Sequence, residues 1–157
     1  MSIEVGSKAP DFTLMDQDRQ PVTLSAALKD SPVVLAFFPA AFSSVCQNEM
    51  CTFRDWLAQV GQVGQAQVFG ISTDTFFALK AWASQQGFNF PLLSDYNKDV
   101  IRSYGVVNPD MIGLRDIAKR AVFVIDRQGV VRHREVLDDA RNEPDYAAVR
   151  QAVSRQS

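Results

Sequence analysis

The sequence predicts an α/β domain in which a central mixed sheet is flanked by helices. Two short runs, residues 33–38 and 67–72, are apolar on both faces. Such runs are typical of strands buried within a parallel sheet. Two segments with helical spacing of apolar residues, 46–60 and 74–86, alternate with these runs. Because alternating strands and helices build a parallel sheet, the pattern favours a parallel core with helices on its faces.

The segments near the two ends of the chain add antiparallel elements to this core. Residues 12–14 and 21–24 lie on either side of the polar turn DQDRQ, which predicts an N-terminal β-hairpin extension. Residues 121–125 and 130–136 flank the turn RQG and predict a second hairpin. Pro144 suits the first position of a final helix, since a helix needs no N–H donor there.

The middle of the chain contains further helix signals. Asp74 or Thr75 can cap a helix that Gly87 is well placed to end. A short helix is expected within residues 95–104. Residues 106–119 have no clear periodicity, and we expect them to form a loop that crosses toward the functional site.

Composition limits the classes of function. With 157 residues, the chain is expected to form one domain over residues 1–157. Its net charge of −2 gives no basic excess, which argues against nucleic acid or an anionic membrane as a main partner. The N-terminus has no signal-peptide pattern, and no apolar stretch approaches the ~18 residues that span a bilayer, so a cytoplasmic location is expected. One histidine and the lack of a C-x2-C pair argue against a zinc site.

The most informative segment is PAAFSSVCQNEMC, at residues 39–51, which contains the only two cysteines, Cys46 and Cys51. It follows a buried strand, begins with a proline turn and places Cys46 in the first turn of a helix. A helix N-terminus favours negative charge and therefore the thiolate, which is the nucleophilic form of cysteine. Two close cysteines in a chain of this kind indicate redox chemistry more than a structural bridge.

The spacing Pro39-x3-Ser43-x2-Cys46 resembles the active-site signature Pro-x3-Thr/Ser-x2-Cys of the peroxiredoxins, thiol peroxidases with a thioredoxin-like fold. The expected order of strands and helices fits that fold with an N-terminal extension. Four further features agree with the resemblance: VGSKAPDFTL at residues 5–14, Glu49, PLLSD at residues 91–95, and Arg120 just before the strand at 121–126. The resemblance therefore covers nearly the whole chain.

The resemblance implies a role for each matching residue. Cys46 is the nucleophile that attacks one oxygen of the peroxide. Ser43 holds the peroxide with its hydroxyl, and Pro39 shields the site. Arg120 stabilises the thiolate and the charge that develops on the oxygens. Glu49 orients an arginine and does not react itself.

The resemblance also implies the substrates and partners. The reaction reduces hydrogen peroxide or organic hydroperoxides to water or an alcohol, and a thioredoxin-like or glutaredoxin-like protein restores the thiols. No metal or organic cofactor is implied, because sulfur carries the redox chemistry. A monomer or a homodimer is expected, with Phe42 as a candidate contact residue beside the catalytic turn.

Different features of the sequence resemble two different branches of the family. A cysteine five residues after the nucleophile resembles the bacterioferritin-comigratory (peroxiredoxin Q) branch. The sequences FFPAAF and CQNE resemble the AhpE branch, which often uses an external thiol for resolution. Five residues along a helix separate two Cα atoms by roughly 8.7 Å, whereas a disulfide tolerates up to about 7 Å. We therefore expect sulfenic acid to form at Cys46, the first helical turns to unwind, and Cys51 then to condense with it.

Several alternatives remain open at the level of sequence. The protein could be a one-Cys peroxidase with external resolution, or a peroxide sensor that relays oxidation by thiol–disulfide exchange. Cys51 could be a buried residue without a redox role. Arg54 could join the arginine network of the site. Phe76, Phe77 and Trp82 have helical spacing and are expected in the core.

Overall fold

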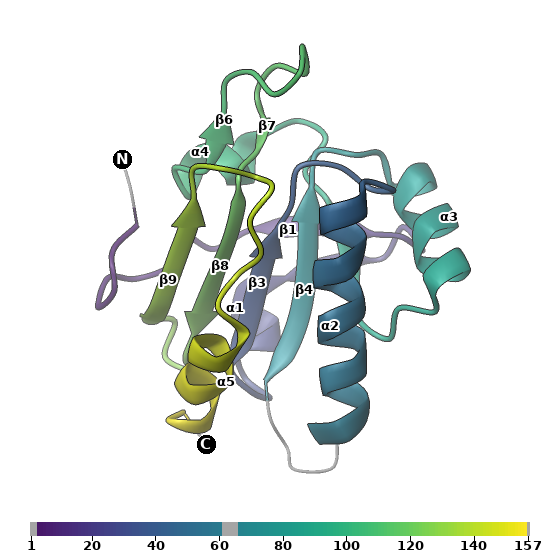
Figure 1. Cartoon of the computed structure of the whole chain (residues 1–157). Helices are drawn as coiled ribbons and strands as arrows, with labels where there is room; N and C mark the ends of the chain where they lie inside the picture. The colour runs from purple at the N-terminus through teal and green to yellow at the C-terminus, as the bar shows by residue number, and fades with distance from the viewer. Residues whose placement is uncertain (1–2, 61–65, 157) are drawn as a thin grey trace.

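The computed structural model describes residues 3–60 and 66–156. Within them, seven strands form one mixed sheet in the order β2-β1-β5-β4-β3-β8-β9 (Figure 1). The strands of this sheet are β1 (Thr13–Asp16), β2 (Pro21–Thr23), β3 (Val33–Phe37), β4 (Gln67–Ser72), β5 (Leu92–Ser94), β8 (Arg120–Ile125) and β9 (Val131–Leu137). A separate small sheet pairs β6 (Val107–Asn108) with β7 (Ile117–Ala118). The helices are α1 (Leu24–Ala27), α2 (Ser44–Val60), α3 (Phe76–Gln86), α4 (Asp99–Ser103) and α5 (Tyr146–Ser154).

Strand β3 lies inside the sheet between β4 and β8, and every one of its residues is buried. This strand pairs in parallel with β4 and antiparallel with β8, and β4 pairs in parallel with β5. Because neighbours cover both edges of β3 and helices cover both faces, its sequence VVLAF is apolar throughout. The predicted mixed sheet is therefore confirmed.

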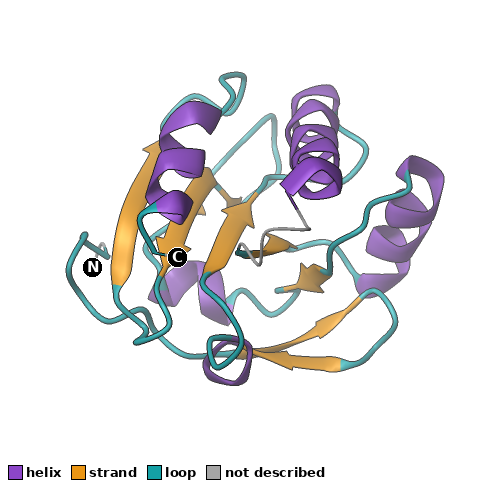
Figure 2. Ribbon diagram, turned by 90° about the horizontal axis from the view of Figure 1, so that it is seen from below, coloured by secondary structure: helices purple, strands orange, loops and turns teal. Residues whose placement is uncertain are grey.

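Helices cover both faces of this sheet (Figure 2). On one face, side chains from α2, α3 and α5, such as Phe53, Trp82 and Val149, form a core with β3, β4 and β8. On the other face, α1 and α4 contribute Leu24 and Ile101 to a second core. The fold thus holds α2 tightly against the sheet along its inner face.

Asp74, just after β4, stabilises the turn that leads into α2. The chain leaves β3 at Phe37, and Phe42 adopts a left-handed conformation with φ 69° just before the helix. The Asp74 carboxylate accepts the N–H of Ala41 at 2.8 Å and the hydroxyl of Ser72 at 2.7 Å. Asp74 therefore fixes the turn, whereas the cap of α3 is Thr75, whose hydroxyl accepts the N–H of Ala78.

The structure confirms most predicted elements and corrects several details. The N-terminal hairpin is present, but β1 also pairs with β5 and so extends the main sheet. The segment 106–119 is mostly loop, as expected, with the β6–β7 pair at its base. Pro144 precedes the cap residue Asp145, so it is not the first helical residue. The expectation of a buried Phe77 is wrong, because this side chain is 70% exposed.

Among the described residues, no helix is both long and apolar enough to cross a bilayer.

Candidate active site

The structure brings three of the residues selected from the sequence into one buried group. The guanidinium of Arg120, at the start of β8, donates to the sulfur of Cys46 at 3.2 Å. It also donates to the carboxyl of Glu49 at 2.9 Å. Cys46 and Glu49 lie three residues apart on α2 and so share one face of the helix. All three side chains are buried, which strengthens the interaction between their charges.

A main-chain carbonyl fixes the orientation of this guanidinium. The oxygen of Ala140, in the segment between β9 and α5, accepts hydrogen bonds from Arg120 Nε at 3.1 Å and from Nη2 at 3.0 Å. Arg120, on β8, therefore joins two other segments of the chain, α2 and the segment between β9 and α5. This partner could not be found from the sequence, because a carbonyl carries no residue-specific signal.

Burial shapes the charges of the arginine and the glutamate. Burial raises the pKa of Glu49 to about 8, although the positive charge of Arg120 acts in the opposite direction. The second carboxyl oxygen of Glu49 is buried and has no hydrogen-bond partner among the described residues. Burial opposes the charged form of Arg120, but Glu49 and Cys46 outweigh it and raise the pKa of the guanidinium. The guanidinium of Arg120 therefore stays charged beside the sulfur of Cys46.

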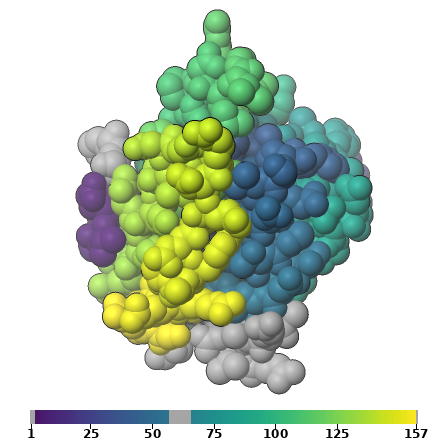
Figure 3. Space-filling view, in the orientation of Figure 1, coloured from purple at the N-terminus to yellow at the C-terminus, as the bar shows by residue number. Residues whose placement is uncertain are grey.

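A cavity of about 520 Å³ lies beside this buried group. Three segments line it: the start of α2, the β6–β7 loop and the turn after β9. Its lining residues are Pro39, Ser43, Ser44, Val45, Asn108, Asp110, Met111, Ile112, Arg120, Asp138, Asp139, Ala140 and Arg141. Figure 3 shows the β6–β7 loop, in green, projecting above the segment that follows β9 and the start of α2. Arg120 connects this cavity to the buried thiol, since it lines the cavity and also donates to the sulfur of Cys46.

Ser43 and the first turn of α2 supply polar groups to this cavity. The hydroxyl of Ser43 donates to the carbonyl of Ala40 at 3.0 Å, and the carbonyl of Ser43 accepts the N–H of Gln47. Ser43 therefore occupies the position that begins the helix. The first N–H groups of a helix have no partner within it, so this end can donate to an anionic oxygen. Pro39 is buried and forms part of the same wall.

Cys51 has different neighbours from Cys46. It is half-buried, and its sulfur lies 3.8 Å from the side-chain oxygen of Gln86 at the end of α3. Arg54, one turn further on, donates to the main-chain carbonyl of Gln86 at 2.6 Å. Asn89 in turn donates to the carbonyl of Arg54 at 3.1 Å. The expectation that Arg54 joins the network around Cys46 is therefore wrong, because its guanidinium ties α2 to the end of α3.

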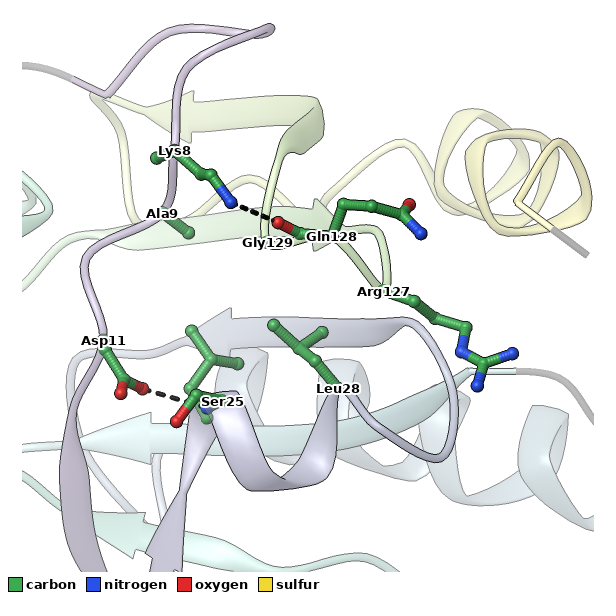
Figure 4. Close-up of a pocket in the computed structure, with 9 residues that line it drawn as sticks. Lys8, Ala9, Asp11, Ser25, Leu28, Arg127, Gln128 and Gly129 are labelled. Carbon is green, nitrogen blue, oxygen red and sulfur yellow. Dashed lines mark hydrogen bonds between the residues drawn. The ribbon is translucent and has the colours of Figure 1, made fainter.

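A second pocket, of about 240 Å³, lies at the opposite ends of β3 and β8 (Figure 4). Its polar groups already have partners within the protein. Lys8 donates to the carbonyl of Gln128, and Arg127 donates to the carbonyl of Lys29. Asp11 accepts the N–H of Ser25. Thiol chemistry is associated with the other cavity, because its lining residue Arg120 donates to the sulfur of Cys46.

Comparisons with known proteins agree with this geometry. The sequence profile of the AhpC/TSA family matches residues 5–134. Alkyl hydroperoxide reductase E of Mycobacterium tuberculosis is 42% identical over 136 residues, which cover 85% of this chain and 86% of that protein. The chloroplastic 2-cysteine peroxiredoxin of Chattonella marina var. antiqua is 35% identical and covers 98% of this chain, with 82% of its own length matched.

Solved structures give the same result for the fold. Peroxidoxin BcpB from Mycobacterium tuberculosis superposes with a TM-score of 0.82 at 34% identity, covering 97% of this chain and 95% of that one. A peroxiredoxin-like protein from Aquifex aeolicus superposes with a TM-score of 0.90 at 28% identity, covering 100% and 90% of the two chains. The predicted thioredoxin-like fold is therefore confirmed.

Proposed function

This chain belongs to the AhpC/TSA family of peroxiredoxins, and from that premise we propose that Cys46 is the nucleophile of its peroxidase reaction. The protein is a thiol-dependent peroxidase, as its relatives among the peroxiredoxins indicate. One observation carries the assignment of the nucleophile. Cys46 lies in the first turn of α2, and its sulfur is 3.2 Å from the buried, charged guanidinium of Arg120.

In the first step, the Cys46 thiolate attacks one oxygen of the hydroperoxide. The S–O bond forms as the O–O bond breaks, and the other oxygen leaves as hydroxide or alkoxide, which takes up a proton. Cysteine is oxidised to sulfenic acid and the peroxide is reduced to water or an alcohol. The positive charge of Arg120 stabilises both the thiolate and the negative charge that moves onto the oxygens.

The residues around Cys46 position the peroxide. Ser43 offers its hydroxyl oxygen to the peroxide hydrogen, and the free N–H groups at the start of α2 donate to the peroxide oxygens. Pro39 closes one side of the cavity and limits access of water. Glu49 is a positioning residue, since it contacts Arg120 and has no exposed surface.

In the second step, we propose that Cys51 resolves the sulfenic acid. The Cys51 thiol attacks the sulfur of Cys46, a disulfide forms and water leaves. Both cysteines are free thiols on one continuous helix. Since that helix keeps the sulfurs too far apart for a bond, its first turns must unwind before the disulfide forms.

Further proposals concern the partners and the setting of the reaction. A dithiol protein of the thioredoxin or glutaredoxin type reduces the disulfide and returns both cysteines to thiols. We infer a monomer or a homodimer that acts as a single domain over residues 1–157. We also infer a cytoplasmic location, since thiol-dependent turnover needs a compartment that keeps cysteines reduced.

The test is mass spectrometry of the reduced protein after one equivalent of hydrogen peroxide. Intact mass and peptide mapping should show a Cys46–Cys51 disulfide that forms within the time course of the first oxidation. If neither cysteine changes, the proposed nucleophile is wrong. If sulfenic acid persists at Cys46, the nucleophile stands and the role of Cys51 is refuted.

A second candidate for the resolving step is an external thiol. It is favoured by the position of Cys51, whose sulfur faces Gln86 on α3 rather than Arg120. The same experiment, repeated with a small thiol in the buffer, separates the two routes. A mixed disulfide at Cys46 supports the external route, whereas an internal disulfide supports Cys51.

A further inference from the structure

We propose that the β6–β7 loop selects hydroperoxides with an uncharged, apolar body and that Asp110 on this loop disfavours anionic ones. This inference rests on the proposed function of Cys46 and concerns the substrate that reaches it. The loop contributes Asn108, Asp110, Met111 and Ile112 to the lining of the cavity. The substrate body must therefore pass these side chains.

The cavity is much larger than a molecule of hydrogen peroxide. A water molecule occupies about 30 Å³ of liquid, and hydrogen peroxide has only one more heavy atom. The cavity of about 520 Å³ leaves room for an organic group on the peroxide. Its walls include apolar atoms from Pro39, Val45, Met111, Ile112 and Ala140, which suit an apolar body.

The charges of the lining nearly cancel, apart from that of Asp110. Asp138 forms an ion pair with Lys119 at 3.7 Å, and Asp139 forms one with Arg141 at 2.8 Å. The charge of Arg120 is offset by the Cys46 thiolate that it contacts in the reactive form.

Asp110 has no such compensation. It takes part in none of the ion pairs found across residues 3–60 and 66–156. Within the part of the chain that the structure describes, its carboxylate accepts one hydrogen bond, from the N–H of Gly113 at 2.9 Å, and the residue is exposed where it lines the cavity. An anionic substrate therefore meets an uncompensated negative charge.

The backbone of the loop presents Ile112 in an unusual way. Met111 and Leu114 exchange two main-chain hydrogen bonds of 2.9 Å, and Ile112 and Gly113 between them have φ values of 50° and 88°. This is a type I′ turn, whose first central position favours Asn and disfavours a β-branched residue. Ile112 is nevertheless there, and it is 91% exposed.

The exposure of Ile112 fits a role in substrate contact. A strained backbone and an exposed apolar side chain both cost free energy, and no packing within the chain offsets these costs at 91% exposure. Contact with the apolar body of a substrate would remove this side chain from water. Ile112 and Asp110 thus act on different properties of the substrate, its apolar surface and its charge.

The experiment compares two substrates that differ by one methyl group and in charge, the para-carboxylate of cumene hydroperoxide and its methyl ester, with hydrogen peroxide as the reference. The measured quantity is the second-order rate constant for oxidation of Cys46, from rapid quenching and mass spectrometry. We expect the ester to react about 3- to 10-fold faster than the carboxylate at low salt, with a ratio that shrinks as salt is added.

Two variants assign the effects to residues. Asp110→Asn keeps an oxygen that can accept the Gly113 N–H and should bring the ester-to-carboxylate ratio toward one. Asp30→Asn is the matched control, since it removes an exposed carboxylate before β3, at the opposite end of the strand, and should leave the ratio unchanged. Ile112→Asn suits the turn and should slow the ester about 3- to 10-fold relative to hydrogen peroxide.

Each result decides between the hypotheses. A wild-type ratio of one or below overturns the inference and points to Arg141 as an anion-binding group. A ratio that Asp110→Asn does not change overturns the role of Asp110. If hydrogen peroxide itself fails to oxidise Cys46, the proposed function fails, and this inference falls with it.

Discussion

Cys46 and Cys51 lie five residues apart on α2, yet different parts of the fold surround them. The sulfur of Cys46 is fully buried and receives a hydrogen bond from the guanidinium of Arg120 at 3.2 Å. The sulfur of Cys51 is half-buried and lies 3.8 Å from the uncharged amide of Gln86. The nearest arginine on the helix, Arg54, turns to a main-chain carbonyl. The helix therefore sets the spacing of the two thiols, while the segments packed against it give one of them a charged partner.

The parts of this helix around the two cysteines also differ in how they can open. Near Cys46, the side chains of Glu49 and Met50 are fully buried against the sheet, so unwinding must draw them out. Exposing a buried methionine alone costs about 1.5–3 kcal/mol. Near Cys51, two hydrogen bonds hold the helix: Arg54 donates to the carbonyl of Gln86 at the end of α3, and Asn89, beyond α3, donates to the carbonyl of Arg54. Arg54 thus marks the point at which we expect the unwinding to stop.

The largest effect on the difference between the two cysteines is expected from removing the guanidinium beside Cys46. Arg120→Lys keeps one positive charge, but an ammonium group cannot donate at once to Cys46, Glu49 and Ala140 in the arginine geometry. We expect the rate constant for oxidation of Cys46 to fall by about 10²- to 10³-fold. Rapid mixing with hydrogen peroxide measures it.

A matched control for this change is Arg132→Lys. Arg132, on β9, pairs with Asp126 at 2.7 Å near the opposite end of the strand. Its replacement should leave the rate constant near the wild-type value. An equal loss in both variants would show that the effect comes from general destabilisation and not from contact with the thiol.

The next effect concerns Glu49 and pH. Burial raises the pKa of Glu49 from 4.5 to about 8 in the folded state. The folded state therefore binds more protons than the unfolded state between these values, and stability is lost as pH rises through about 8. Glu49→Gln should remove this dependence, which is on the order of 3 kcal/mol between about pH 5 and pH 8.

Urea denaturation of the reduced protein at a series of pH values measures this change. The wild-type free energy of unfolding should fall over the range relative to that of the Glu49→Gln variant. Parallel curves for the two proteins would mean that Arg120 keeps Glu49 ionised in the folded state throughout the range.

A smaller effect is expected from Cys51→Ser. The variant cannot form the internal disulfide, so excess peroxide should convert Cys46 to sulfinic acid about 10-fold more readily. The first oxidation should keep its rate constant within about two-fold, because the Cys51 sulfur does not contact Arg120. Mass spectrometry follows both species. A large loss in the first oxidation would contradict the separation of the two thiols.

The smallest effect tests the tie between α2 and α3. Arg54→Ala removes the hydrogen bond to the Gln86 carbonyl, which makes unwinding beyond Cys51 easier. We expect disulfide formation after oxidation to become about 3- to 10-fold faster, from the usual strength of such a hydrogen bond. Lys80→Ala is the control, since this exposed cation of α3 pairs with Asp18 instead. Slower disulfide formation in Arg54→Ala would mean that the tie assists resolution.

Much of the fold could be predicted because the long elements have strong patterns. The helix between Thr75 and Gly87 carries signals at both ends, and the structure has the cap and the left-handed residue in those places. Some of the short elements escaped prediction. The helix α1 has four residues and β5 has three, which is too few for a period to show. Phe77 was misjudged because spacing gives the face of a helix, whereas exposure depends on what covers it.

The site divides in the same way. A local motif was enough to select Pro39, Ser43 and Cys46. Arg120 could be selected because it stands just before a strand that was itself predictable. The carbonyl of Ala140 could not, since any residue presents the same group there. The uncompensated charge of Asp110 escaped as well, because pairing of charges across the cavity depends on tertiary contacts.

The contact between Arg120 and the Ala140 carbonyl has a consequence for the time during which the chain is synthesised and folds. The arginine comes 74 positions after the nucleophile, and the carbonyl comes 20 positions after the arginine. A growing chain that already carries Cys46 therefore lacks the Arg120 contact for much of its synthesis. In our proposal, the thiol becomes reactive only when folding joins these distant segments, so we expect the nascent polypeptide to resist oxidation until the site is complete.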